Sequence, residues 1–251
     1  MMNRERRFPT HVEKAQNRAN VVTLAGDGAA GPRDMMTYAI GDVHGCLDKL
    51  AHLLLRCVDH AGGRPQRFVL VGDYIDRGPD SRGVIDLLIK VKQEVTGDVI
   101  TLCGNHEAMM LDAIGTGDDT LWRINGADQT LASYGISEAA DMPRKHVDWV
   151  AALPLCFDDG RRYFVHAGVD PRRPLSRQSE QDQLWIREPF LSHERDYGRL
   201  IVHGHTPLRT GLPDQRPNRV NIDTAAVYGG PLTAAVFTDE VTQPVEFLRS
   251  E

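Results

Sequence analysis

The sequence predicts an α/β fold in which two β-sheets pack together as a sandwich flanked by α-helices. Three apolar runs end in Gly-Asp or Gly-Asn at Gly41, Gly72 and Gly104, and amphipathic stretches separate them. This spacing matches the roughly 30 residues of a strand–helix–strand unit. The second half of the chain is instead rich in short strands. Helices on a parallel sheet, followed by a strand-rich half, are typical of two packed sheets with helices outside.

The first sheet is predicted from the three apolar runs. They indicate strands at 37–40, 67–71 and 98–103, with helices at 46–61 and 81–95 whose apolar residues recur every three or four positions. Right-handed crossovers between the strands would make them parallel. The Gly-Asp and Gly-Asn pairs then lie at the carboxyl ends of the strands, along the edge where open α/β sheets bind ligands.

The remainder of the chain contains helices first and strands afterwards. Residues 106–153 have a helical pattern. Short strands are expected beyond them, at 154–159, 161–167, 199–204, 219–223 and 232–238.

Composition divides the chain into two regions. Residues 1–34 are polar and end in loop-forming residues, so we expect a flexible N-terminal extension. Residues 35–251 are expected to form one domain, because a chain of 251 residues fits one large domain better than two.

The overall composition is that of an ordinary soluble protein. A net charge of -6 gives no reason to expect nucleic acid or an anionic membrane as a partner. No apolar run approaches the roughly 20 residues of a membrane helix, and no secretory signal is recognisable. The four cysteines form no CxxC pair, which argues against a thiolate zinc site and for a reducing compartment. We therefore expect a cytoplasmic monomer.

Polar side chains with metal-binding chemistry follow the predicted strands. Taken singly, each motif is more typical of a turn or a helix cap than of a metal site. Together, at the ends of strands of one fold, they predict a metal site. Mixed oxygen and nitrogen ligands suit manganese, iron, zinc or magnesium rather than calcium. The residues are Asp42 and His44, then Asp73, Asp76 and Arg77, then Asn105 and His106, and finally His166 and His205; His203 is expected to pack or to support a ligand.

The motifs GDVHG, GDYIDRG, GNHE, HAG and HGHT occur in this order. This series resembles that of the PPP-type serine/threonine protein phosphatases, within the calcineurin-like metallophosphoesterases. The resemblance extends from about Thr37 to Phe237 and is greatest to the compact bacterial and phage branch, which has similar versions of GNHEAMM, LWIREPF and NIDTAAVYGGPLTAAV. It implies the sandwich fold and makes residues 35–251 a metallophosphoesterase catalytic domain.

The resemblance also implies two divalent metal ions, with manganese expected and iron, zinc or magnesium compatible. Asp42 and His44 match ligands of the first ion, and Asp73 matches the carboxylate that bridges both. Asn105, His166 and His205 match ligands of the second ion. Matches outside the ligand set are His106 beside the leaving group, Asp76 orienting it, and Arg77 and Arg187 gripping the phosphate.

The implied activity is hydrolysis of phosphoserine and phosphothreonine monoesters in a phosphoprotein or phosphopeptide, by direct attack of a hydroxide that bridges the two metals. Phosphotyrosine remains open as a substrate. The alternative is symmetrical hydrolysis of diadenosine tetraphosphate, because related enzymes share these motifs. In that group alanine and aspartate are expected where this chain has Asp76 and Glu107. A non-catalytic scaffold is disfavoured, since every matched ligand is present.

Several positions depart from the pattern or carry local predictions. Ala127 and Ala225 stand where glycines are expected, and a turn that requires positive φ would resist alanine. Pro207 replaces the second histidine of the GHxH motif of phosphodiesterases, which argues against that activity. Glu107 is expected to favour the dipole of a helix, and Ser81 to cap the helix that follows it.

Overall fold

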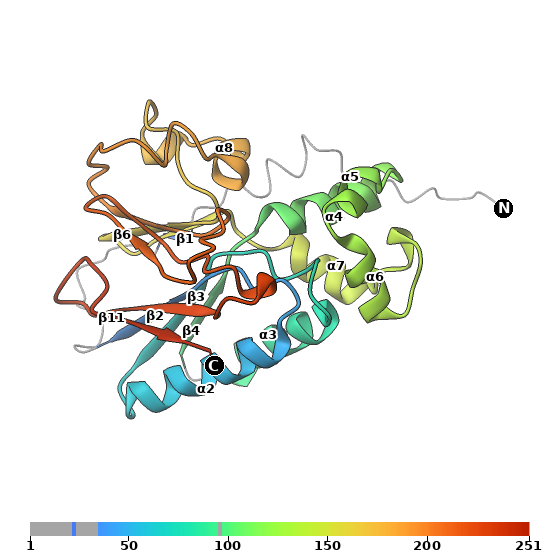
Figure 1. Ribbon diagram of the computed structural model, residues 1–251, viewed down its shortest axis with the longest axis horizontal. Helices are drawn as coiled ribbons and strands as arrows, with labels where there is room; N and C mark the ends of the chain where they lie inside the picture. Colours follow the sequence, from blue (N-terminus) through green and yellow to red (C-terminus); the bar gives the residue numbers. More distant parts are fainter. Residues whose placement is uncertain (1–21, 24–34, 95–96, 251) are drawn as a thin grey trace.

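The computed structural model of the chain describes residues 22–23, 35–94 and 97–250. Two β-sheets lie face to face, and helices cover the outer face of one of them (Figure 1). The five-stranded sheet has the order β11-β10-β2-β3-β4, and the six-stranded sheet has the order β1-β5-β6-β7-β9-β8. The predicted two-sheet sandwich with flanking helices is confirmed.

The five-stranded sheet contains the three strands predicted from the apolar runs. β2 pairs in parallel with β3, and β3 with β4, as the strand–helix–strand spacing predicts. β10 and β11 extend the sheet with antiparallel pairs on the other side of β2. The strands are β2 (Met36–Ile40), β3 (Gln66–Leu70), β4 (Asp98–Thr101), β10 (Thr233–Phe237) and β11 (Glu246–Arg249).

The six-stranded sheet has a parallel centre and mixed edges. β6 pairs in parallel with β7, and β7 with β9, while β5 and β8 run antiparallel to their neighbours β6 and β9. β1 pairs in parallel with β5. The strands are β1 (Val22–Thr23), β5 (Cys156–Asp158), β6 (Arg162–Val165), β7 (Leu200–His203), β8 (Asp214–Gln215) and β9 (Arg219–Asn221).

The predicted extension over residues 1–34 lies outside the described residues except for β1 and its two residues. Its boundary and its flexibility therefore stay predictions. The short strands β1, β8 and β11 are not foreseen from the sequence. Among the described residues, no helix has the length and apolar content needed to span a bilayer.

The helices connect the strands or follow them in a separate group. α2 and α3 cross between parallel strands, and the helical segment predicted at 106–153 forms four α-helices. The helices are α2 (Leu47–Ala61), α3 (Ser81–Glu94), α4 (Asn105–Thr116), α5 (Thr120–Ile124), α6 (Ala127–Tyr134), α7 (Arg144–Ala151) and α8 (Glu180–Trp185), with short 3₁₀ turns at Ala139–Asp141, Leu175–Arg177 and Ala226–Tyr228 (η3).

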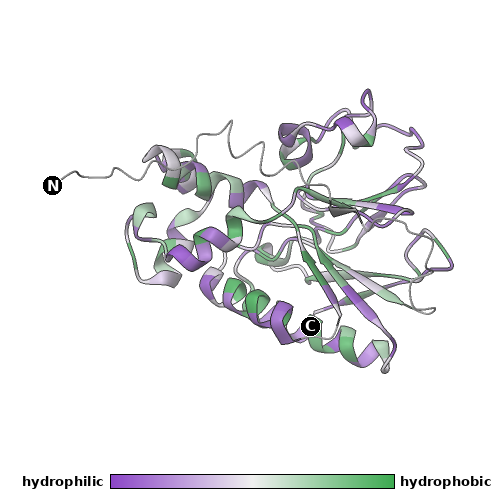
Figure 2. Cartoon of the chain, turned by 180° about the vertical axis from the view of Figure 1, so that it is seen from behind, coloured by the Kyte–Doolittle hydropathy of each residue, from purple (hydrophilic) through white to green (hydrophobic). Residues whose placement is uncertain are grey.

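Two apolar layers hold the sheets and helices together. Successive side chains of a strand point to opposite faces. On β3, Phe68 and Leu70 pack against the helices, while Val69 belongs to the cluster between the sheets. Phe164 of β6 and Phe237 of β10 meet in that inner cluster. Figure 2 shows the apolar residues along the strands and in stripes on the helices.

The structure tests the three local predictions about turns and caps. Ala225 has φ 61°, the left-handed conformation that favours glycine. Ala127 begins α6, and the positive φ falls on the preceding Gly126 instead. The prediction that Ser81 caps α3 is wrong: the Asp80 carboxylate accepts the Gly83 N–H at 2.7 Å, whereas the Ser81 hydroxyl is buried and accepts the N–H of Asp76.

The two alanines provide a matched stability test. Ala225→Gly relieves a left-handed alanine, which costs about 1–2 kcal/mol, against a smaller entropic penalty for glycine. Ala127→Gly relieves no backbone strain, and it lowers the free energy of unfolding by about 1 kcal/mol because glycine is unfavourable in a helix. Urea unfolding should therefore find Ala225→Gly more stable than Ala127→Gly by about 1–2 kcal/mol. Equal losses in the two variants would contradict the strain assigned to Ala225.

Candidate metal centre and active site

The structure brings the predicted site residues together at one edge of the two sheets. They occupy the carboxyl ends of β2, β3, β6 and β7 and the start of α4. All the predicted metal ligands are buried, whereas Arg77 is half-buried and Arg187 is exposed. In chain order they are Asp42 and His44 after β2, Asp73, Asp76 and Arg77 after β3, Asn105 and His106 at the start of α4, His166 after β6, Arg187 after α8, and His205 after β7.

The backbone at this edge is held in an unfavourable conformation. Six non-glycine residues in the described part of the chain have positive φ, between 45° and 73°. Such conformations concentrate at functional sites, where the surrounding structure enforces them. Five of the six are predicted site residues, namely His44, Asp73, Asp76, Arg77 and His205.

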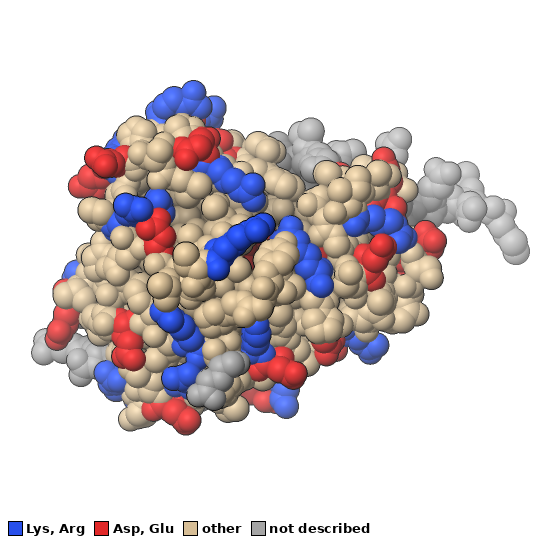
Figure 3. Space-filling model, in the orientation of Figure 1, with Lys and Arg blue, Asp and Glu red and all other residues tan. Residues whose placement is uncertain are grey.

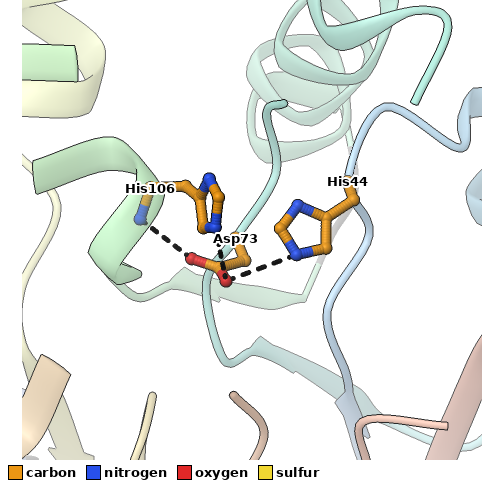
Figure 4. Close-up of side chains that lie close together, drawn as sticks. All are labelled: His44, Asp73 and His106. Carbon is orange, nitrogen blue, oxygen red and sulfur yellow. Dashed lines mark hydrogen bonds and ion pairs between the residues drawn. The ribbon is translucent and has the colours of Figure 1, made fainter. Parts of the chain in front are cut away.

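Two groups of side chains have donor atoms close enough to hold a metal ion, and Asp73 belongs to both. His44, Asp73 and His106 form one group and Asp73, His166 and His205 the other; within each, the donor atoms lie within 4.8 Å of one another. Figure 4 shows the first group, in which the histidine rings of different elements face the Asp73 carboxylate. The distance from His44 Nε2 to Asp73 Oδ2 is 3.4 Å. His/Asp residues are thus positioned for a dinuclear metal site.

The amide oxygen of Asn105 lies beside the second group, and its role as a ligand stays a prediction. Its Oδ1 lies 2.8 Å from His166 Nε2 and 2.9 Å from His205 Nδ1. The two ring nitrogens are themselves 3.2 Å apart. His166 Nε2 is also 3.4 Å from Asp73 Oδ1, the oxygen of Asp73 that faces away from His44. The four side chains therefore converge on one point.

The orientation of the histidine rings suits metal ligands. Nδ1 of His44 lies 2.8 Å from the Ile75 carbonyl, and Nδ1 of His166 lies 3.0 Å from the Val71 carbonyl. Each Nδ1–H donates to its carbonyl, so Nε2 carries no proton and its lone pair faces the site. Burial lowers the pKa of His44 to about 3, so its ring is neutral, as metal binding requires.

The carboxylates of the site also indicate a bound cation. Asp42 and Asp73 are 3% and 2% exposed. Burial, followed by the charges of Asp223 and Asp73, raises the pKa of Asp42 well above its usual value. Buried charge of one sign is costly without a counter-ion, so the residues fit divalent ions. Asp42 lies outside both three-residue groups, with its oxygens accepting the His205 N–H, so its ligand role stays a prediction.

A cavity of about 300 Å³ opens onto the metal centre. Arg77 and Arg187 both line it, and their role in binding phosphate stays a prediction. Figure 3 shows basic side chains across the middle of the face that it draws. Arg77 Nη1 lies 2.8 Å from His44 Nε2. The sequence did not single out Asn125, Trp185 or Tyr228, which line the same cavity, because an isolated polar or aromatic residue carries no spacing signal.

His106 and Asp76 form a buried pair beside the metal centre. Nδ1 of His106 lies 2.6 Å from Asp76 Oδ2, and the two side chains are 1% and 0% exposed. The backbone N–H of His106 donates to Asp73 Oδ1 at 3.1 Å. With Nδ1 bound to Asp76, Nε2 is the nitrogen on the side of Asp73, 3.9 Å from its Oδ2. The predicted pairing of these two residues is therefore present.

Glu107 has a larger role than the helix-dipole contact expected for it. Its carboxylate is fully buried and accepts the backbone N–H groups of Asp73 at 2.9 Å, Tyr74 at 2.8 Å and Gly104 at 2.9 Å. Glu107 therefore ties the turn after β3 to the start of α4. Sequence reasoning missed this because the acceptor and its first two donors are more than 30 residues apart.

Gly104 is required by how closely these two segments approach. A Cβ atom at this position would lie 2.2 Å from Asp73 Oδ1 and 2.3 Å from the Asp73 nitrogen. Any side chain here would displace the Asp73 carboxylate from the metal centre. His203, by contrast, is a packing residue: it is fully buried, and its ring centroid lies 5.0 Å from that of Phe190.

Comparison with known proteins identifies the family. The family model of calcineurin-like phosphoesterases matches residues 35–240. The chain belongs to this family. Its members' fold is the two-sheet arrangement described above, and a serine/threonine phosphatase from Saccharomyces cerevisiae shares it at a TM-score of 0.62. That structure is 18% identical and the match covers 95% of this chain and 85% of the other, so it bears on the fold alone.

Two curated relatives carry different activities in their names. The chain is 31% identical to serine/threonine-protein phosphatase 1 of Salmonella typhimurium, over 79% of this chain and 90% of the relative. It is 33% identical to the symmetrical bis(5'-nucleosyl)-tetraphosphatase of Neisseria meningitidis, over 83% and 95%. The predicted membership of a metal-dependent phosphoesterase family is thus confirmed, and the relatives support both the predicted substrate class and its alternative.

Glu107 allows a direct test of how the metal centre is held. Glu107→Gln replaces one acceptor oxygen with an NH₂ group, so at least one backbone N–H loses its partner and the Asp73 turn loosens. Isothermal titration of the metal-free protein with Mn²⁺ should show about 10- to 100-fold weaker binding. The exposed Glu138→Gln is the control and should bind like the wild type. Unchanged affinity in Glu107→Gln would refute the role assigned to Glu107.

Proposed function

We propose that the protein hydrolyses phosphate monoesters of serine and threonine in phosphoproteins or phosphopeptides, with two divalent metal ions. The observation that carries this proposal is the buried pair of His106 and Asp76, with 2.6 Å between Nδ1 and Oδ2. A metal centre and two arginines suit any phosphoester. The pair is what distinguishes the substrate classes, because it is suited to supply a proton.

The leaving group decides whether a proton donor is needed. A serine or threonine alkoxide is a poor leaving group and requires protonation as the ester bond breaks. A nucleotide phosphate leaves as a stable anion and needs no such help. Burial lowers the pKa of His106, but the carboxylates of Asp73 and Asp76 outweigh it and raise the pKa above its usual value. An imidazolium held in this way is a general acid for an alkyl phosphate.

The remaining residues bind and orient the phosphate. Arg77 and Arg187 line the cavity and offer planar guanidinium groups that match two phosphate oxygens at once. When bound, the divalent ions lower the pKa of water and so supply the nucleophile. The oxygen of that water bonds to phosphorus as the ester P–O bond breaks. His106 Nε2 gives its proton to the departing oxygen, which leaves as the serine hydroxyl.

We propose manganese as the metal, and the mixed oxygen and nitrogen ligands also accept iron, zinc or magnesium. Asp73, at the meeting point of the two histidine groups, would contact both ions, with His44 on one side and His166 and His205 on the other. We propose that the protein acts as a monomer on a peptide substrate, because one chain supplies both arginines and His106 to the cavity at the metal centre.

The second candidate is hydrolysis of a dinucleoside polyphosphate. Trp185 and Tyr228 favour it, because both rings line the cavity and aromatic side chains provide surfaces on which nucleobases stack. Tyr228 also lies beside Arg77, with 5.9 Å between the guanidinium carbon and the ring centroid. This candidate leaves the His106–Asp76 pair without a function in catalysis.

One experiment separates the two candidates. Phosphate release from a phosphoserine peptide and cleavage of diadenosine tetraphosphate are measured with Mn²⁺, for the wild type and for His106→Asn. We expect the wild type to prefer the phosphopeptide. Loss of the general acid should lower kcat on the peptide by about 10²- to 10⁴-fold.

Two controls accompany this assay. Mn²⁺ titration of His106→Asn should show that metal binding is kept, and chelation should abolish the activity of the wild type. Turnover of diadenosine tetraphosphate far above that of the peptide would overturn the proposal. An unchanged kcat of His106→Asn on the peptide would remove His106 as the acid, and activity that survives chelation would contradict the metal-dependent mechanism.

A further inference from the structure

The Asp76 carboxylate has two hydrogen-bond donors besides His106, and both come from the helices that follow α4. The indole Nε1–H of Trp122 lies 3.0 Å from Oδ1 and 2.8 Å from Oδ2. The hydroxyl of Thr130 donates to Oδ1 at 2.6 Å. Asp76, Trp122 and Thr130 are 0%, 1% and 0% exposed, so water does not compete for these contacts.

Thr130 also fixes the backbone that carries Asp76. Its hydroxyl oxygen accepts the Asp76 N–H at 2.8 Å, and the Ser81 hydroxyl lies 2.9 Å from it. One step along, the Arg77 N–H donates to the Gly126 carbonyl at 3.1 Å. Asp76 and Arg77 both have positive φ, at 73° and 68°. The segment from α5 to α6 therefore holds both the side chain and the strained backbone at Asp76.

These contacts favour one direction of the Asp76 carboxylate. Every donor that the described residues present to it requires an acceptor oxygen, which an ionised carboxylate provides on both sides. Hydrogen bonds to a charged acceptor contribute more than those between neutral groups. Thr130 holds Oδ1 and the Trp122 N–H lies between the two oxygens, which fixes the plane of the carboxylate with Oδ2 facing Nδ1 of His106.

We propose that Trp122 and Thr130 are positioning residues for the reaction: they hold the Asp76 carboxylate aligned on His106, so that His106 can protonate the leaving group. Neither residue belongs to the two metal groups or to the residues that line the cavity. The inference rests on the proposed function, because a general acid matters only where the leaving group needs a proton. Under this proposal, the α5–α6 segment supports the residue that acts as the general acid.

The consequence is a dependence on the leaving group. Trp122→Phe removes the N–H but keeps a ring, and Thr130→Val removes the hydroxyl at nearly constant volume. Each variant should lower kcat on a phosphoserine peptide by about 10- to 100-fold, the factor that corresponds to one hydrogen bond to a charged group. With p-nitrophenyl phosphate, whose phenolate leaves without a proton, kcat should fall by less than about threefold on the same scale.

The experiment uses the Mn²⁺-loaded protein with both substrates and two matched controls. Thr101→Val removes a buried hydroxyl that has no hydrogen-bond partner in the described structure. Trp149→Phe changes a half-buried indole on α7 outside this network. Both controls should keep both rates. Thr130→Ser restores the hydroxyl and should recover the peptide rate.

The outcomes separate a positioning role from a structural one. Equal losses on both substrates, or no loss on the peptide, would overturn the inference. Melting curves show whether each variant folds, and Thr130→Val decides the matter alone if Trp122→Phe is unfolded. A wild type that does not act on phosphopeptides contradicts the proposed function. In that case an alkyl phosphate such as glycerol phosphate replaces the peptide. The loss of kcat on this ester, relative to the loss on p-nitrophenyl phosphate, then tests the positioning of His106.

Discussion

Asp73 places a buried carboxylate between two groups of histidines, and the surrounding chain is arranged to keep it there. Its backbone is in the left-handed region, Glu107 binds its N–H, and Gly104 leaves room for its oxygen. Because each of its oxygens faces a different group, this one side chain sets where both metal ions can sit. The two arginines line the cavity with Asp73, and Nε2 of His106 lies 3.9 Å from its Oδ2.

The left-handed backbone at this site is unfavourable by itself, and many hydrogen bonds hold it in place. A left-handed residue other than glycine costs about 1–2 kcal/mol, and five of them cluster here. Their sum is comparable to the roughly 5–15 kcal/mol of net stability of a whole domain. The strain is tolerated because buried acceptors hold each turn: Glu107 holds the turn at Asp73, and Ser81 and Thr130 hold the turn at Asp76. Divalent cations would add to this by neutralising the buried carboxylates.

The sequence predicts the parts of this structure that repeat or alternate. The parallel strands β2, β3 and β4 follow from their even spacing, and the candidate ligands are predicted from their places at strand ends. Strands of two to four residues at sheet edges, such as β8 and β11, are too short to show a pattern. Contacts between distant segments leave no local signal either, which is why Trp122 and Thr130 were missed. Ser81 was misread as a helix cap because its partner, the Asp76 N–H, becomes visible only in three dimensions.

The bridging position of Asp73 can be observed directly. Crystals of the protein grown with Mn²⁺ would be measured at the manganese absorption edge, where anomalous scattering locates each ion. The account predicts two peaks about 3.5–4 Å apart, each within coordination distance of an Asp73 oxygen, with His44 beside one and His166 and His205 beside the other. A single peak, or two peaks of which only one contacts Asp73, would contradict it.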